Sequence, residues 1–172
     1  MNLTSTVLAL AATVLASPLI GCGSAPVAIV AQGSQGVRPD LEQQNVDRDG
    51  LAIAGYDPVS YFEGGASKPQ RGKPEHSLLE RGVTYRFATA ENLELFKSTP
   101  GKYEPAYGGW CAYAVAKGSK VEIDPRSFLI QDGRLLLFYK SFLNDTRKTW
   151  GKTPGEFGVH ADEYWAKLIQ AE

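Results

Sequence analysis

The clearest pattern of apolar and polar residues lies in residues 128–139, where two apolar runs flank Asp132-Gly133. An Asp-Gly pair between apolar runs is typical of a two-residue type I′ turn, so the segment predicts a β-hairpin. A hairpin with two apolar faces is expected at the centre of a domain, covered on each side by helices. One face carries Phe128, Ile130, Leu135 and Leu137, and the other carries Leu129, Leu136 and Phe138.

A second hairpin is predicted over residues 76–87, turning at Arg81-Gly82. Apolar and polar residues alternate over residues 83–87, which indicates one buried face. A two-residue turn fixes which residues lie opposite each other, and it turns the histidine of the first strand towards the core. The expected pairs are Leu78 with Tyr85 and His76 with Phe87.

Helices are predicted from capping residues and apolar stripes. Asp57-Pro58 and Thr89 are expected to start two short helices, and Ser141 a third. Residues 51–54 are expected to form a short strand. The third helix should bury Phe142, Thr146 and Trp150. The last helix begins at the capping box Thr153-Pro-Gly-Glu156 and should bury Phe157, Ala161, Tyr164, Trp165 and Leu168.

These elements predict an α+β fold, a small single domain in which two antiparallel β-hairpins pack against several short helices. We expect the domain to span residues 50–172, a length that can enclose one core. Residues 22–49 are rich in Gly, Ser, Gln and Asp and are expected to form a linker or tether.

Residues 1–21 have the apolar, small-residue composition and the length of a signal peptide. Their end, Leu19-Ile20-Gly21-Cys22, resembles the cleavage box of bacterial lipoproteins, in which the cysteine becomes the lipidated N-terminus. The resemblance implies a lipid on Cys22 and an extracytoplasmic, membrane-anchored protein of the cell envelope. Ordinary secretion after cleavage at Ala16 is the alternative.

The charge distribution bears on the partners. The formal net charge is −1 at pH 7, and the chain contains no run of lysines or arginines. A nucleic-acid partner is therefore not expected. The membrane is expected as a partner through the lipid on Cys22 rather than through a basic surface.

Residues 103–118 are the stretch with the most suggestive chemistry. A helix is predicted from Trp110 to Lys117 and ends at Gly118. Cys111 would lie in its first turn, where free backbone N–H groups favour a thiolate. The alternative is that Cys111 is a small apolar residue, since it shares one helix face with Ala114 and Val115.

Several of these motifs together resemble the YHS domain, and in particular the secreted YHS-domain proteins of bacteria. They are Gly55-Tyr-Asp-Pro-Val-Ser60, Glu75-His-Ser77, Tyr85-Arg-Phe87, Tyr107-Gly-Gly-Trp-Cys-Ala112, Asp124-Pro125 and Asp132-Gly133. The resemblance covers roughly residues 50–150 and implies a fold in which some relatives bind metal through three cysteines. The corresponding positions here are Ser60, Ala88 and Asn92, which cannot replace thiolates.

Three classes of function follow. The first is a binding module for a soft metal such as copper, with Cys111 and His76 as ligands. The second is a module for a small organic ligand or a protein, whose cleft is lined by Tyr107, Gly108, Gly109, Trp110 and Tyr113. The third is a cysteine-dependent enzyme, which is disfavoured because no base that would activate Cys111 is evident.

Overall fold

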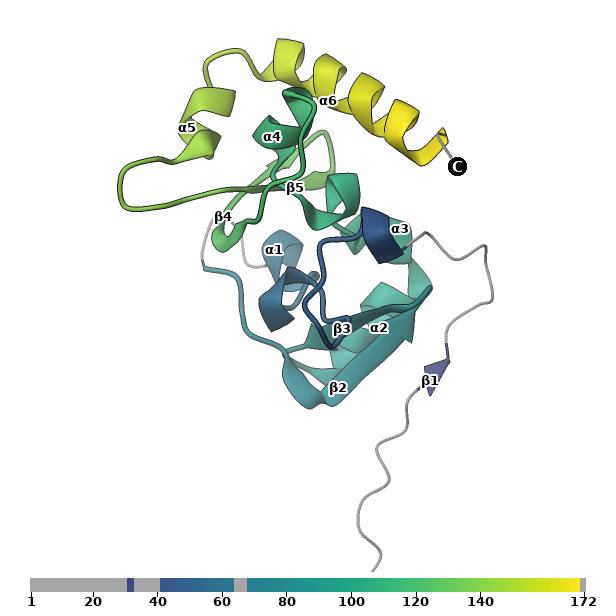
Figure 1. The fold of residues 1–172 in the computed structure, drawn as a ribbon. Helices are drawn as coiled ribbons and strands as arrows, with labels where there is room; N and C mark the ends of the chain where they lie inside the picture. The colour runs from purple at the N-terminus through teal and green to yellow at the C-terminus, as the bar shows by residue number, and fades with distance from the viewer. Residues whose placement is uncertain (1–30, 33–40, 64–67, 171–172) are drawn as a thin grey trace, which may run out of the picture.

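The computed structural model describes residues 31–32, 41–63 and 68–170, so the predicted signal peptide and Cys22 lie outside the described residues. It has an α+β fold, as predicted (Figure 1). The strands are β1 (Ala31–Gln32), β2 (Lys73–Glu80), β3 (Val83–Phe87), β4 (Asp124–Gln131) and β5 (Arg134–Phe138). The α-helices are α1 (Ser60–Glu63), α2 (Ala90–Ser98), α3 (Pro100–Tyr103), α4 (Ala112–Ala116), α5 (Thr146–Trp150) and α6 (Pro154–Gln170). Short 3₁₀ turns are η1 (Leu41–Gln43), η2 (Ile53–Gly55) and η3 (Ala106–Gly109).

The hairpin β4–β5 divides the interior into two cores. It turns at Asp132-Gly133, where both residues have positive φ, as a type I′ turn requires. Leu135 and Leu137 point into one core, and Leu136 and Phe138 point into the other. The prediction of a central hairpin with two apolar faces is therefore confirmed for β5. It is wrong for part of β4, because Ile130 is 40% exposed.

The hairpin β2–β3 supplies much of the first core. Leu78 pairs with Tyr85, as predicted, and the turn at Arg81-Gly82 again has positive φ at both residues. The predicted pairing of His76 with Phe87 is wrong. A bulge between Lys73 and Ser77 shifts the register, so that Lys73 faces Phe87. β1 pairs in parallel with β2 on the other side.

The second core is built between α4, α5, α6 and the hairpin β4–β5. Trp150 and Ala161 are fully buried in it, and Phe157, Tyr164 and Trp165 of α6 pack against it. These α6 residues are the predicted stripe except for Leu168, which is half-buried and outside this cluster. Figure 1 shows α6 running over α4 at the top of the molecule. In the described part of the chain, no helix is both long enough and apolar enough to cross a membrane.

Two local predictions are wrong for identifiable reasons. Residues 51–54 form isolated bridges and the turn η2, because Ile53 and Ala54 have positive φ. The third helix starts at Thr146 rather than Ser141, because Asp145 is its N-cap and accepts a hydrogen bond from the Arg147 N–H. Residues 141–144 are consequently a loop.

The domain begins before residue 50. The segment 41–49, which the composition assigns to the tether, packs on the domain and buries Asn45. The Asn45 N–H donates to the Gly108 carbonyl at 2.8 Å, and its side-chain amide donates to the Gly109 carbonyl at 3.1 Å. Residues 41–49 therefore belong to the packed structure rather than to a free tether.

Candidate functional site

The Gly108-Gly109 pair is covered by the chain's own backbone. A Cβ at Gly108 would lie 2.4 Å from the Gln43 carbonyl oxygen and 2.9 Å from Cη2 of Trp165. Gly108 also has a φ of +59°, a conformation that glycine adopts without strain. The two glycines therefore allow the segment 43–45, rather than a ligand, to approach closely.

The three aromatic residues of the predicted cleft, Tyr107, Trp110 and Tyr113, are engaged in packing. Tyr107 meets Trp165 edge to face at 6.2 Å between ring centroids, and Tyr113 meets Phe157 at 5.1 Å. The Trp110 indole N–H donates to the Gln43 carbonyl at 2.9 Å. Rings held in this way contribute to the core rather than offering a free face to a ligand.

Tyr107 lines two small pockets of about 190 and 210 Å³. Its hydroxyl donates to Asp162 at 2.9 Å, and the Arg134 guanidinium lies 4.9 Å from its ring centroid. Burial, followed by the hydrogen bond to Asp162, raises the pKa of Tyr107 well above its ordinary value. The phenol is therefore a neutral donor at physiological pH.

Cys111 is fully buried and is the N-cap of α4, rather than a residue within the first turn as predicted. Its Sγ lies 3.4 Å from Oγ1 of Thr146, and its backbone bridges to Leu137 of β5. Ala114 and Val115 are buried on the same helix face. This is the environment of a small apolar core residue, the alternative that the helix-face pattern had left open.

The structure does not bring His76 to Cys111. His76 is half-buried in the bulged part of β2, where its charge would act on Glu91 of α2. Figure 1 shows β2 at the lower end of the molecule and α4 at the upper end. Among the described residues, no group of three or more His, Cys, Asp or Glu side chains could hold a metal ion. Within the described residues, Cys111 and His76 therefore do not form the shared metal site that the copper hypothesis requires.

The three positions at which the YHS resemblance implies thiols meet around a buried aspartate, Asp57. Its Oδ1 accepts hydrogen bonds from the Val59 and Ser60 N–H groups at 2.8 and 3.3 Å. Its Oδ2 accepts from the Ala88 N–H at 2.8 Å and from the Asn92 side-chain amide at 2.6 Å. These bonds tie the start of α1 to the end of β3 and to α2, so the cluster has a structural role.

An open groove lies along the outer side of β4. It has a volume of about 760 Å³, within the range of sites for small organic ligands. In the described sheet β4 pairs only with β5, so its other edge is free of strand partners. Apolar side chains line the groove, with three basic residues among them. The lining residues are Tyr61, Phe62, Lys68, Pro69, Arg126, Phe128, Leu129, Ile130 and Arg147.

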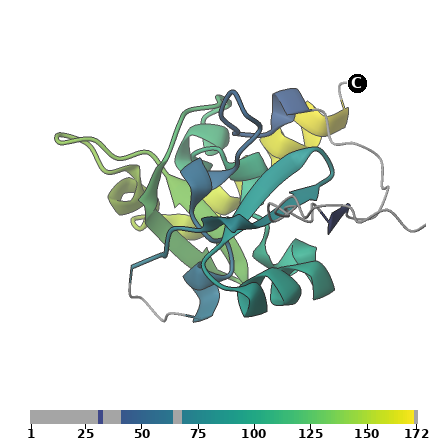
Figure 2. The same cartoon turned by 90° about the horizontal axis from the view of Figure 1, so that it is seen from below.

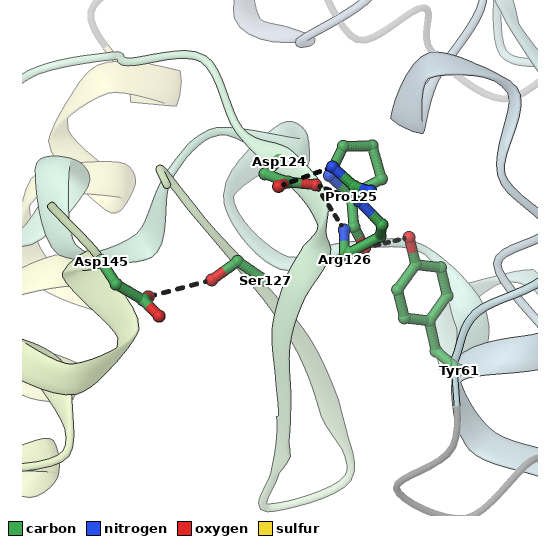
Figure 3. A network of polar contacts seen from close by, with 6 residues as sticks. All are labelled: Tyr61, Asp124, Pro125, Arg126, Ser127 and Asp145. Carbon is green, nitrogen blue, oxygen red and sulfur yellow. Dashed lines mark hydrogen bonds and ion pairs between the residues drawn. The ribbon is translucent and has the colours of Figure 1, made fainter. Parts of the chain in front are cut away.

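Tyr61 fixes the floor of the groove through two contacts, and Figure 3 shows the one to Pro125. The Tyr61 hydroxyl donates to the Pro125 carbonyl at 2.8 Å, which ties α1 to the start of β4. The Tyr61 ring meets Phe128 edge to face at 4.8 Å between centroids. Burial raises the pKa of Tyr61 far above its ordinary value, so this hydroxyl keeps its proton and its hydrogen bond.

The polar end of the groove is held by two further contacts in Figure 3. Arg126 donates to both carboxylate oxygens of Asp124, from Nε at 3.2 Å and from an Nη at 3.3 Å. Burial opposes ionisation of Asp124, but the hydrogen bonds from Arg126 outweigh it and lower the pKa of that carboxyl. The Ser127 hydroxyl donates to Asp145 at 3.2 Å, which joins β4 to the N-cap of α5.

The basic residues of the groove differ in their partners. Arg126 is paired with Asp124. Arg147 and Lys68 form no ion pair with any residue that the structure describes. Two unpaired cations beside apolar side chains can accept a negatively charged group without first breaking an existing ion pair. The groove therefore has the composition of a site for a molecule with an apolar body and an anionic end.

Sequence reasoning missed this groove, because it treated Phe128, Leu129 and Ile130 as covered on both faces. One local signal was present. Pro125 lies inside β4, and proline within a strand indicates an edge strand, since it cannot donate to a neighbour. The cations could not have been placed beside the strand, since Lys68 and Arg147 are distant from it in sequence.

The described residues thus form an α+β domain with a lateral groove at an edge strand. No protein-family model matches the chain, and no curated protein or solved structure matches it either.

Proposed function

We propose that the domain is a binding module for an amphipathic organic anion, which it holds in the groove along β4. The observation that carries the proposal is the combination of an apolar lining with Arg147 and Lys68, two cations without carboxylate partners among the described residues. The apolar side chains would supply affinity by removing hydrocarbon from water. The cations would orient the anionic end of the ligand.

The proposed location is the cell envelope, with a lipid on Cys22 as the anchor. The support is the apolar leader that ends in Leu19-Ile20-Gly21-Cys22, together with the linker composition that follows. Replacing Cys22 by Ala should release the protein from membranes after a wash with high salt. Retention of the Cys22→Ala protein after that wash would contradict lipid anchoring.

The ligand class can be tested with dodecanoate and 1-dodecanol, which share a chain length and differ in charge. Isothermal titration calorimetry should give dodecanoate at least a roughly tenfold higher affinity, because a charge-assisted hydrogen bond contributes about 1.5–3 kcal/mol. Arg147→Gln should remove most of this difference. Equal affinity for both compounds in the wild type would contradict the proposal.

The place of binding needs its own control. Ile130 and Leu95 are almost equally exposed, at 40% and 41%, but only Ile130 lines the groove. Ile130→Asp should abolish dodecanoate binding, because it puts a negative charge on the apolar lining. Leu95→Asp on α2 should bind like the wild type. If the two variants behave alike, the groove is not the site.

A further inference from the structure

The loop between β5 and α5 presents two apolar side chains fully to solvent. Phe142 is 101% exposed and Leu143 is 91% exposed. The other large apolar side chains that count as exposed in the described residues range from 37% to 56%. The segment 140–145 projects from the body of the molecule in both ribbon views (Figures 1 and 2). Such adjacent, fully exposed apolar residues are unusual on a soluble surface and indicate an interaction.

The loop holds this tip in a defined shape. The Ser141 N–H donates to the Asn144 carbonyl at 2.7 Å, and the Asn144 N–H donates to the Ser141 hydroxyl at 3.2 Å. Phe142 and Leu143 are therefore the two central residues of a closed four-residue turn. At the base of the loop, the backbones of Lys140 and Asp145 form an antiparallel β-bridge. The Thr146 hydroxyl donates to the Tyr139 carbonyl at 2.9 Å.

The tip is surrounded by positive charge. Lys140, Arg147 and Lys148 border the loop, and Lys140 and Lys148 are exposed. The acidic residue of the loop is Asp145, whose Oδ1 accepts hydrogen bonds from Ser127 and from the Arg147 N–H. Asp124, which Lys140 also influences, is paired with Arg126. The surroundings of the tip therefore carry a net positive charge.

We propose that this loop docks on an anionic lipid bilayer. Phe142 and Leu143 would enter the boundary between headgroups and acyl chains, and Lys140 and Lys148 would lie among the anionic headgroups. A convex tip of two side chains suits a deformable bilayer better than a protein partner, whose stable interfaces usually bury about 800 Å² on each side. Arg147 lines both the loop and the groove, so a docked domain would hold its groove close to the membrane surface.

The test uses residues 22–172 with Cys22→Ala, so that no lipid anchor contributes. The protein is mixed with vesicles of phosphatidylcholine, alone or with phosphatidylglycerol, and vesicle binding is measured by flotation. Phe142→Ser/Leu143→Ser should lower the partition coefficient on the mixed vesicles by at least roughly tenfold, because burying one large apolar side chain accounts for that much. Both residues are fully exposed, so the fold should not change.

Three controls make the result decisive. Val159→Ser/Ile169→Ser removes two exposed apolar residues of α6 and should leave binding unchanged. Lys140→Gln and Lys148→Gln should each weaken binding to the mixed vesicles roughly fivefold, but not to phosphatidylcholine alone. Leu143→Cys with an environment-sensitive dye should report an apolar environment on the mixed vesicles, because Cys111 is buried and stays unlabelled. Wild-type protein that does not float, or an equal loss in the α6 control, would overturn the proposal.

Discussion

Two of the aromatic-rich regions of this domain differ in how far the fold covers them. The first is the stretch 107–113, which contains Cys111 and reads in the sequence like a binding cleft. The second is the groove formed by Tyr61, Phe62, Phe128 and neighbouring residues. In the stretch 107–113 the cysteine side chain is inaccessible to solvent, since Cys111 is 0% exposed. The groove is accessible and has a volume of about 760 Å³.

The difference comes from segments that are distant in sequence. The backbone of residues 43–45 covers Gly108 and Gly109, and α6 brings Phe157 and Trp165 against the aromatic rings. In the described sheet, no strand pairs with the free edge of β4. An aromatic cluster is therefore a candidate site only if the rest of the fold leaves it uncovered.

The largest effect is expected at Gly108. Gly108→Ala should lower the free energy of unfolding by about 3 kcal/mol, because the new Cβ meets the Gln43 carbonyl and the residue has positive φ. Chemical denaturation measures this change. The matched control is Gly158→Ala in α6, where a Cβ would meet no atom within 4 Å, and a gain of up to about 1 kcal/mol is expected. A similar loss of unfolding free energy in both variants would mean that residues 43–45 do not cover Gly108.

Cys111 should behave as a core residue. Cys111→Ser should lower the free energy of unfolding by about 1–2 kcal/mol, because it places a hydroxyl where the sulfur is fully buried. The native thiol should react slowly with a bulky maleimide and quickly after unfolding, which a mass-spectrometric time course would follow. Rapid labelling of the native protein would show that the stretch 107–113 opens.

The predictions from sequence that failed are also those that depend on contacts between segments distant in sequence. Local signals predicted both hairpins, the Leu78–Tyr85 register and the stripe of α6, since turn type and periodicity act over a few residues. Two features could not be predicted locally: the bulge that moves His76, and the N-cap at Asp145 that leaves Phe142 exposed. In both places the local sequence allows more than one conformation, and tertiary contacts determine which one forms. The groove depends on Lys68, β4 and α5 meeting in space, so only Pro125 hinted at it.

A smaller effect is expected at the floor of the groove. Tyr61→Phe should cost about 1 kcal/mol, the usual value of one hydrogen bond. Because burial raises the pKa of folded Tyr61 above that of the unfolded chain, its contribution is present at neutral pH and is lost as the pH rises above about 10. Denaturation at several alkaline pH values should show a smaller loss for Tyr61→Phe than for the wild type. Burial also raises the pKa of Tyr85, so Tyr85 should account for part of the stability that the Tyr61→Phe variant still loses at alkaline pH. An identical pH dependence in both proteins would contradict the account of the floor.

The smallest effect on stability is expected on the lining of the groove. Ile130→Asp and Leu95→Asp should each change the free energy of unfolding by no more than about 0.5 kcal/mol, since both side chains are substantially exposed. Thermal denaturation of the two variants provides the measurement. A loss of several kcal/mol at Ile130 alone would mean that this part of β4 is covered in solution.

The most direct test of the account compares the two aromatic regions in one experiment. Dodecanoate is added to isotopically labelled protein, and NMR chemical shifts are followed at the groove and at the stretch 107–113. The account predicts saturable shift changes at Phe62, Leu129 and Ile130, while Trp110 and Tyr113 stay unchanged. Shift changes centred on Trp110 and Tyr113, with an unaffected groove, would contradict it.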